Sequence, residues 1–174
     1  MDKELAVESL TDVMAKFTAY IGKRLPTDVK KKTAQLRAAE TNPLAIAVYD
    51  SMAENQDYAD KLDRPSCQDT GVIQYFIAAG AKFPLLGELE NILENATLEA
   101  TIKGPLRHNA VETFVEKNTG TNTGSKIPWL DWEIIPDADY AMIDVYMAGG
   151  GCTLPGSAKV LMPGQGYEGV TEFV

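Results

Sequence analysis

The sequence predicts an α+β fold, with a helical N-terminal third followed by a mixed, mostly antiparallel sheet region and its covering helices. Apolar residues recur at every third or fourth position in the first third, which is typical of amphipathic helices. A mainly apolar run at 72–77 and an alternating segment at 140–147 are typical of strands. With 174 residues the chain is long enough for one hydrophobic core and short for two. We therefore expect a single domain over residues 1–174.

Three helices are expected before the first strand. The first covers residues 5–24, and Leu25-Pro26 marks its end. Its apolar stripe consists of Leu10, Val13, Met14, Phe17 and Ile21. The second covers about 27–40, and the third follows the capping residue Asn42 and fades within the polar segment 54–63. The apolar residues of the third helix are Leu44, Val48 and Met52. We interpret all three helices as structural.

The middle of the chain predicts one strand and one helix. The apolar run, extended to 72–79, indicates a buried strand. Residues 87–101 indicate a helix with one apolar stripe. That stripe consists of Leu89, Ile92, Leu93 and Leu98. A single stripe of this kind favours a place in the core over a functional surface.

The last part of the chain predicts further strands. Those at 130–135 and 140–147 are expected to form an antiparallel hairpin, because the turn-forming segment 136–139 joins them. A short strand is expected at 158–162. A helix begins at Tyr167, and its apolar face has hardly started when the sequence stops. The whole region therefore indicates a sheet with two unlike faces.

Composition excludes several classes of protein. The net charge is −9, and the only run of basic residues is Lys30-Lys31-Lys32, so no basic face for nucleic acid is expected. No apolar run approaches membrane-spanning length, so no membrane association is expected. Cys67 and Cys152 lie far apart and predict neither a zinc pair nor a disulfide framework. These features favour a cytoplasmic protein with free thiols or thiolate ligands.

The segment Cys67-Gln68-Asp69-Thr70-Gly71 is the strongest candidate site. It places a soft thiolate ligand, an amide, a carboxylate and a hydroxyl side by side just before the buried strand. Gly71 allows the backbone to bend there. The alternative is that Cys67 is a small buried hydrophobic residue, as many cysteines are.

Three further segments carry candidate chemistry. Arg107, next to the single histidine His108, can clamp a carboxylate through its planar guanidinium, or it can simply pair with a surface acid. The doubled Asn-Thr-Gly at 118–124 predicts a loop with two points of positive φ, which either cradles an anion or merely connects elements. Gly149-Gly150-Gly151 indicates either close approach of a ligand to bare backbone or a tight turn.

Taken together, these segments resemble one known family. CQDTG at 67–71, PLRHNAV at 105–111, NTGTNTG at 118–124 and MAGGGC at 147–152 are similar to motifs of the iron–sulfur hydro-lyases of the class I fumarase and L-tartrate dehydratase family. The resemblance covers nearly the whole chain. Fumarases of this class more often have serine where Cys152 stands, which favours tartrate over fumarate as the substrate.

The resemblance implies a cofactor and a set of site residues. A [4Fe–4S] cluster held by three cysteines acts as a Lewis acid, and Cys67 matches the first of those cysteines. Gln68, Asp69 and Arg107 match positions that bind a small dicarboxylate substrate, and Asp69 is the expected catalytic residue. Gly150 falls at or beside a glycine that contacts the substrate through its backbone. The implied reaction is dehydration of L-tartrate to oxaloacetate, with hydration of fumarate as the alternative.

The resemblance also implies missing parts. The other two cluster cysteines of the family lie beyond the position of Val174, so the chain is expected to be the N-terminal portion of an α subunit and inactive alone. Expected partners are a β subunit or C-terminal domain, together with homo-association. Two other hypotheses stay open: a non-catalytic module that docks onto a partner subunit, and a generic α+β domain in which Cys67 is a core residue.

Overall fold

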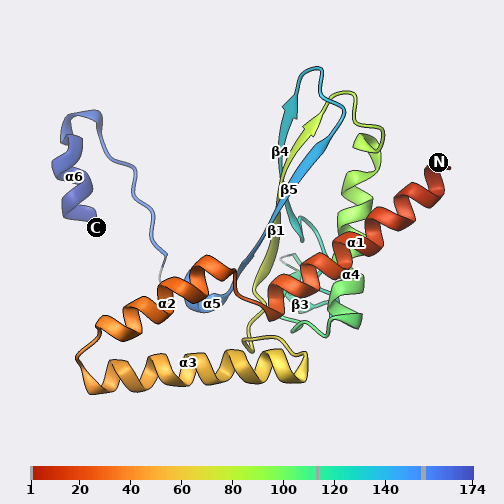
Figure 1. Cartoon of the computed structure of the whole chain (residues 1–174). Helices are drawn as coiled ribbons and strands as arrows, with labels where there is room; N and C mark the ends of the chain where they lie inside the picture. The colour runs from red at the N-terminus through yellow and green to blue at the C-terminus, as the bar shows by residue number, and fades with distance from the viewer. Residues whose placement is uncertain (1, 113, 154–155) are drawn as a thin grey trace.

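The chain folds as α+β around one three-stranded sheet (Figure 1). The computed structural model describes residues 2–112, 114–153 and 156–174. Two helices pack on one face of the sheet, and a helical hairpin lies at the end of the sheet where the central strand begins. The C-terminal segment extends away from the sheet and ends in a short helix. The predicted fold class is confirmed.

The three N-terminal helices form where the sequence predicts them. They are α1 (Lys3–Lys23), α2 (Thr27–Ala39) and α3 (Pro43–Leu62). The Asn42 side chain caps α3 by accepting a hydrogen bond from the Leu44 amide N–H at 2.9 Å. α3 continues through the polar segment in which it was expected to fade. Its Glu, Gln, Asp and Lys residues cost a solvent-facing helix little, and α3 has only one buried residue, Ala59, among those described.

The sheet has the order β4–β1–β5, with β4 at Trp129–Ile135, β1 at Val72–Gly80 and β5 at Ala141–Ala148. β1 is parallel to β4 and antiparallel to β5. The predicted hairpin between β4 and β5 is therefore wrong, because β1 lies between them. The connection after β4 passes over the end of β1. There the Gly80 amide donates to the Tyr140 carbonyl at 2.8 Å and the Lys82 amide donates to the Ala138 carbonyl at 2.9 Å.

The remaining elements are short apart from one helix. α4 (Leu89–Lys103) follows a single 3₁₀ turn, η1 (Leu86–Glu88), and confirms the predicted helix. A small antiparallel pair consists of β2 (Val111–Glu112) and β3 (Lys117–Asn118). The C-terminal elements are α5 (Gly150–Thr153), η2 (Pro163–Gln165) and α6 (Gly166–Phe173). The strand predicted at 158–162 is absent from the described residues. That segment has no strand edge beside it, and Val160 is 94% exposed.

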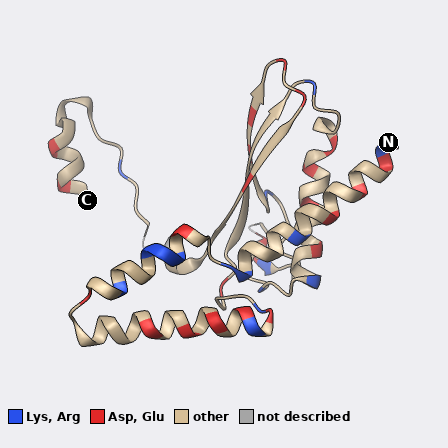
Figure 2. Cartoon of the chain, viewed as in Figure 1, with Lys and Arg blue, Asp and Glu red and all other residues tan. Residues whose placement is uncertain are grey.

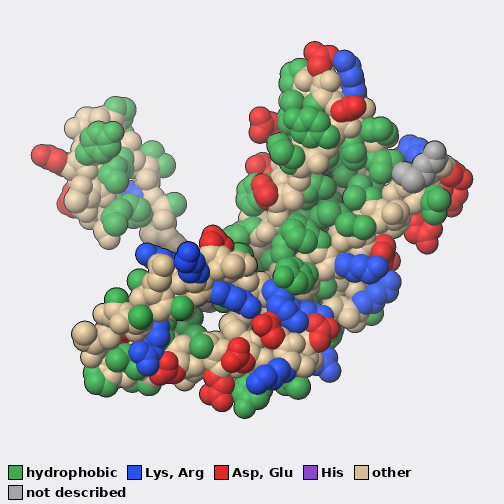
Figure 3. All heavy atoms as spheres, viewed as in Figure 1, with side chains coloured by type: hydrophobic (Ala, Val, Ile, Leu, Met, Phe, Trp, Pro, Cys, Tyr) green, Lys and Arg blue, Asp and Glu red, His purple; other side chains and the backbone are tan. Residues whose placement is uncertain are grey.

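The core lies between one face of the sheet and the helices α1 and α4. Alternate residues of β1 point into it, as the two-residue period of a strand requires. The core residues are Met14, Ala15, Ala19, Ile73, Tyr75, Ile77, Ala79, Leu89, Leu93, Ala96, Ala100 and Leu106. The opposite sheet face is open, and large apolar side chains remain exposed on it, including Phe76, Trp129, Met142 and Tyr146 (Figure 3).

Much of the apolar surface outside this core is also exposed. Leu44, Val48 and Met52 of α3 are all exposed, as are Val13 and Phe17 of α1. The charged side chains along α3 are mainly acidic, whereas basic side chains gather on α2 (Figure 2). Among the described residues, the search for a helix that is both long and apolar enough to cross a bilayer finds no candidate.

Tyr75 carries a polar group into this core. Its hydroxyl lies 2.9 Å from Thr18 Oγ1 and 3.1 Å from Thr97 Oγ1, so it joins β1 to both covering helices. Burial raises the pKa of Tyr75 above its ordinary value of 10.0, although the two hydrogen bonds act in the opposite direction. Neutral tyrosine is therefore favoured in the folded protein.

Replacing Tyr75 by phenylalanine should lower the free energy of unfolding at neutral pH by about 1–2 kcal/mol, because a buried threonine hydroxyl loses its partner. The variant should also lose less stability at alkaline pH. In the wild type, Tyr75 ionises first in the unfolded chain, so its contribution holds below about pH 10 and declines as the pH rises toward the folded-state pKa. Urea unfolding at about pH 8 and about pH 11 measures both effects. Parallel pH profiles for the two proteins would contradict the assignment.

Candidate functional site

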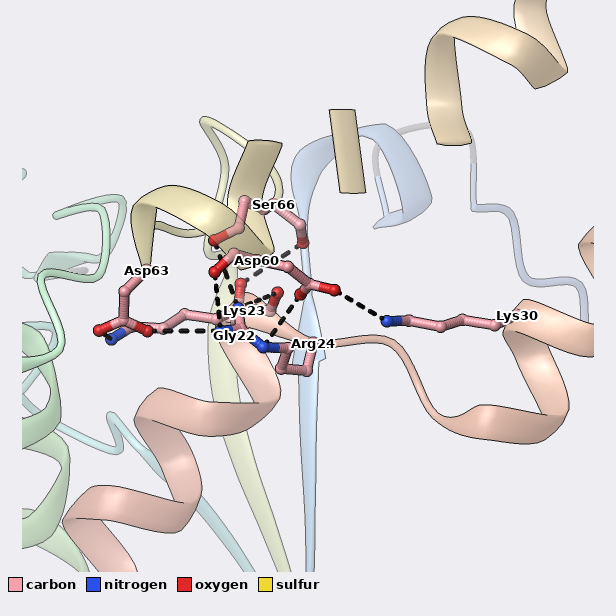
Figure 4. A network of polar contacts seen from close by, with 8 residues as sticks. Gly22, Lys23, Arg24, Lys30, Asp60, Asp63 and Ser66 are labelled. Atoms are coloured by element: carbon pink, nitrogen blue, oxygen red, sulfur yellow. Dashed lines mark hydrogen bonds and ion pairs between the residues drawn. The ribbon is translucent and has the colours of Figure 1, made fainter. Parts of the chain in front are cut away.

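The segment before Cys67 is anchored by a polar network between the ends of α1 and α3 (Figure 4). Lys23 Nζ lies 2.9 Å from Asp63 Oδ2, and Arg24 Nε lies 3.0 Å from Asp60 Oδ1. The Ser66 amide donates to the Gly22 carbonyl at 3.2 Å. The hydrogen bond from Lys23 is the main cause that holds the pKa of Asp63 below its ordinary range. These contacts fix the chain just before the candidate thiol.

Cys67 is a free thiol with an exposed side chain. Its Sγ lies 3.9 Å from Gln68 Oε1, a contact within the range of a weak sulfur hydrogen bond. The hypothesis that Cys67 is a buried core residue is therefore wrong. A reachable thiol beside polar groups is available for ligation, whereas a buried one is inert.

Asp69 joins the first motif to the glycine segment. Its Oδ1 accepts a hydrogen bond from the Gly71 amide at 2.8 Å, and its Oδ2 accepts one from the Gly150 amide at 2.5 Å. Asp69 and Gly150 are 81 positions apart in the sequence and belong to different motifs. The carboxylate thus holds two predicted site segments together, a contact that sequence reasoning did not find.

At this junction, close backbone approach requires glycine at position 71, and Gly149 lies close to the Asp69 carboxylate. Gly71 has φ of +73°, and a Cβ there would lie 2.1 Å from the Ala148 carbonyl oxygen. A Cβ at Gly149 would lie 3.1 Å from Asp69 Oδ2. Gly150 begins α5, so the glycine segment combines a close contact with a tight helical turn. Cys152 lies in α5, and its side chain is outside the described part of the structure.

The segment holding Arg107 is bound to the first motif through Thr70. The Arg107 amide donates to Thr70 Oγ1 at 2.8 Å, and the Thr70 amide donates to Asn109 Oδ1 at 2.9 Å. Thr70 is itself buried. The motifs at 67–71 and 105–111 are therefore one structural unit.

The Asn-Thr-Gly loop is joined to the segment holding Arg107 by hydrogen bonds of the Asn122 side chain. The Asn122 side chain is only 1% exposed. Its Oδ1 accepts a hydrogen bond from the Ala110 amide at 3.1 Å. Its Nδ2 donates to the Arg107 carbonyl at 2.7 Å and to Thr101 Oγ1 at 3.2 Å. The two predicted points of positive φ occur at Gly120 and Asn122. Asn118 Nδ2 also donates to the His108 carbonyl. The loop thus positions the Arg107 segment.

Gln68 and Arg107 line one cavity of about 640 Å³. Its walls are Arg64, Pro65, Gln68 and residues 105–109. Arg107 has an exposed side chain and no ion-pair partner among residues 2–112, 114–153 and 156–174. The alternative in which Arg107 merely pairs with a neighbouring surface acid is therefore not seen there. A cavity lined by an unpaired guanidinium and an amide is suited to bind a carboxylate.

The described side chains form no complete metal site. They contain no group of three or more His, Cys, Asp or Glu residues placed to hold a metal ion. Cys67 can supply one thiolate to an iron–sulfur cluster, which is normally held by several cysteines. The chain has only two cysteines in total, so three thiolates cannot come from one copy of it.

The fold and site together define an α+β domain with an arginine-lined cavity and an exposed thiol at the neighbouring Cys67. Comparison with protein families gives the particular class: the fumarate hydratase (fumerase) model matches residues 11–174, and the chain belongs to that family. The resemblance seen in the four motifs is confirmed.

Individual relatives agree with this assignment. The chain is 58% identical over 173 residues to the L(+)-tartrate dehydratase subunit alpha of Escherichia coli O157:H7, and equally identical to the protein of that name from Shigella sonnei. A relative from Methanocaldococcus jannaschii is 28% identical over 169 residues. The alignment with the first two covers 99% of this chain and 57% of each relative, so the chain spans little more than half their length.

Replacing Asp69 by asparagine should release α5 from the first motif. An amide has one acceptor oxygen, so its NH₂ group would face one of the two backbone donors now bound by the carboxylate. We expect faster hydrogen exchange at the Gly150 amide and a loss of about 1.5–3 kcal/mol in the free energy of unfolding. Asp131→Asn, on the exposed surface of β4, makes the same change of charge and is the control. Unchanged exchange at Gly150 in Asp69→Asn would contradict this role.

Proposed function

We propose that this chain is the N-terminal portion of an α-type subunit of an iron–sulfur hydro-lyase that dehydrates L-tartrate to oxaloacetate. The observation that carries the proposal is the convergence of motifs 67–71, 105–111 and 147–152 on Asp69 and Thr70, beside a cavity lined by Gln68 and Arg107. The family match and the names of the relatives support the same reaction class.

Each residue has a defined part in the proposal. Arg107 binds one carboxylate of the diacid through paired guanidinium N–H groups, and the Gln68 amide donates a further hydrogen bond. In this proposal the Gly150 backbone contacts the substrate. Asp69 is the proposed catalytic residue. Each of its oxygens accepts one backbone hydrogen bond and keeps a second lone pair, so the carboxylate can still accept a proton or hydrogen bond from the substrate.

The proposed cofactor is a [4Fe–4S] cluster with Cys67 as one ligand. When bound, it supplies a Lewis acid for the departing hydroxyl group. The exposure of Cys67 fits such a ligand, while the remaining thiolates must come from outside the residues described. We therefore expect the isolated chain to be inactive and to act with a β subunit or C-terminal domain, with homo-association in the assembly. A cytoplasmic location is part of the proposal, because a free ligand thiol needs a reducing compartment.

A chimaera tests this function against its alternatives. This chain replaces the matching segment of the E. coli relative, the rest of that relative is retained, and its partner subunit is co-expressed under anaerobic conditions. We expect conversion of L-tartrate to oxaloacetate, with a decrease of more than about a hundredfold in Cys67→Ser and a loss of bound iron. Arg107→Gln should raise KM for L-tartrate while iron is retained.

The outcomes separate the hypotheses. Faster turnover of fumarate and L-malate than of L-tartrate would favour the fumarate hydratase alternative. Full activity in Cys67→Ser with unchanged iron content would show that the segment is a docking module without chemistry. The isolated chain, reconstituted with iron(II) and sulfide, should show no turnover. Dehydration of L-tartrate by that chain alone would disprove the need for a partner.

A further inference from the structure

Arg64 lines the same cavity as Arg107. The cavity of about 640 Å³ is lined by both arginines, with Gln68 also in its wall. No acidic residue lines it. In a chain of net charge −9, a cavity lined by two arginines and no acid is a local exception, and it favours an anion with more than one negative group.

Arg64 forms no close ion pair with its acidic neighbour Asp63, and its charge is only the smallest of the contributions that lower the pKa of Asp63. Asp63 is already bound by Lys23 at 2.9 Å and by Arg24 at 3.5 Å. Within the described ranges Arg64 has no ion pair of its own. Its guanidinium is therefore available to a ligand, whereas those of Arg24 and Arg37 are held by Asp60 and Asp50.

The backbone holds Arg64 at the cavity wall. α3 ends at Leu62, its C-cap residue Asp63 has φ of +49°, and the Arg64 amide donates to the Ala59 carbonyl at 3.1 Å. Pro65 disfavours helical dihedrals at Arg64, so the chain leaves the helix in an extended conformation. Arg64 and Arg107 thus come from two separate elements that meet at one cavity, and each is fixed by its own backbone hydrogen bond.

We propose that Arg64 binds the second carboxylate of the diacid while Arg107 binds the first. This inference rests on the function proposed above and adds a residue that makes the cavity select diacids over monoacids. Guanidinium groups bind carboxylates through two parallel N–H groups, so each end of a diacid finds its own partner. A monocarboxylate uses Arg107 alone and does not need Arg64.

Calorimetric titration of the 174-residue chain with L-tartrate and with L-lactate tests the assignment. Arg64→Gln should raise the Kd for L-tartrate about tenfold and change the Kd for L-lactate less than about twofold. Arg64→Lys should give an intermediate Kd for L-tartrate, since a point charge replaces the fork. The control is Arg37→Gln, which makes the same change of charge at an α2 residue outside the cavity wall and should leave both Kd values unchanged.

The results separate failure of this inference from failure of the proposed function. Equal weakening of both ligands in Arg64→Gln would show a general effect of charge and overturn the assignment. Unchanged L-tartrate binding in Arg64→Gln, with binding lost in Arg107→Gln, would overturn it while the proposed function stands. If the wild-type chain binds no L-tartrate, the assignment of Arg64 is overturned, whereas the proposed function is decided by turnover in the chimaera. Circular dichroism establishes that each variant is folded.

Discussion

Replacing Asn122 by alanine is expected to lower the free energy of unfolding by about 3–5 kcal/mol. The side chain makes three hydrogen bonds from a fully buried position, and two of its partners are the backbone groups of Arg107 and Ala110. Truncation leaves those groups without a partner, and each such loss costs about 1–3 kcal/mol. Alanine would also have to adopt φ of +56°, which asparagine tolerates better.

Glycine at the same position separates the two causes. Asn122→Gly loses the same hydrogen bonds but accepts positive φ, so it should be about 1 kcal/mol more stable than Asn122→Ala. Urea unfolding followed by circular dichroism measures both values. Both variants should also weaken L-tartrate binding, because the Arg107 backbone loses its support. A loss below about 1 kcal/mol in Asn122→Ala would contradict the structural role given to this loop.

The second large effect is expected from Gly71→Ala, which should destabilise the fold by about 3–5 kcal/mol or prevent folding. Its Cβ would overlap the backbone of Ala148 at 2.1 Å and that of Gly149 at 2.4 Å. Backbone atoms of the central sheet cannot move aside as a flexible side chain could. Relief of the overlap requires β5 to shift, and that shift would carry Gly150 away from Asp69.

Gly120→Ala is the matched control for Gly71→Ala. Gly120 has the same φ of +73°, but nothing lies within 4 Å of a Cβ placed there. It should therefore lose only the conformational term of about 1 kcal/mol. Thermal unfolding of the two variants gives the difference directly. Equal melting temperatures would mean that the close approach at Gly71 is not a constraint.

The local elements were largely predictable from the sequence because their signals are local. The periodicity of α1 and α4, the cap at Asn42 and the apolar run of β1 each act within a few residues. The motif at 67–71 and Arg107 were found in the same way, since a recognisable cluster of residue types stands out in one chain. The predicted strand at 158–162 failed because its β-forming residues have no partner edge.

By itself, the sequence determined the helices and the strands β1, β4 and β5, and it indicated which segments form the candidate site. Only the tertiary structure decided that β1 lies between β4 and β5, and that Asp69, Thr70 and Asn122 bind the motif segments together. Arg64 became a candidate ligand-binding residue only through its place on the cavity wall in the folded chain. The physical reason is that strand order, buried hydrogen bonds and cavity walls join residues far apart in the chain, and no local pattern specifies which distant partners meet.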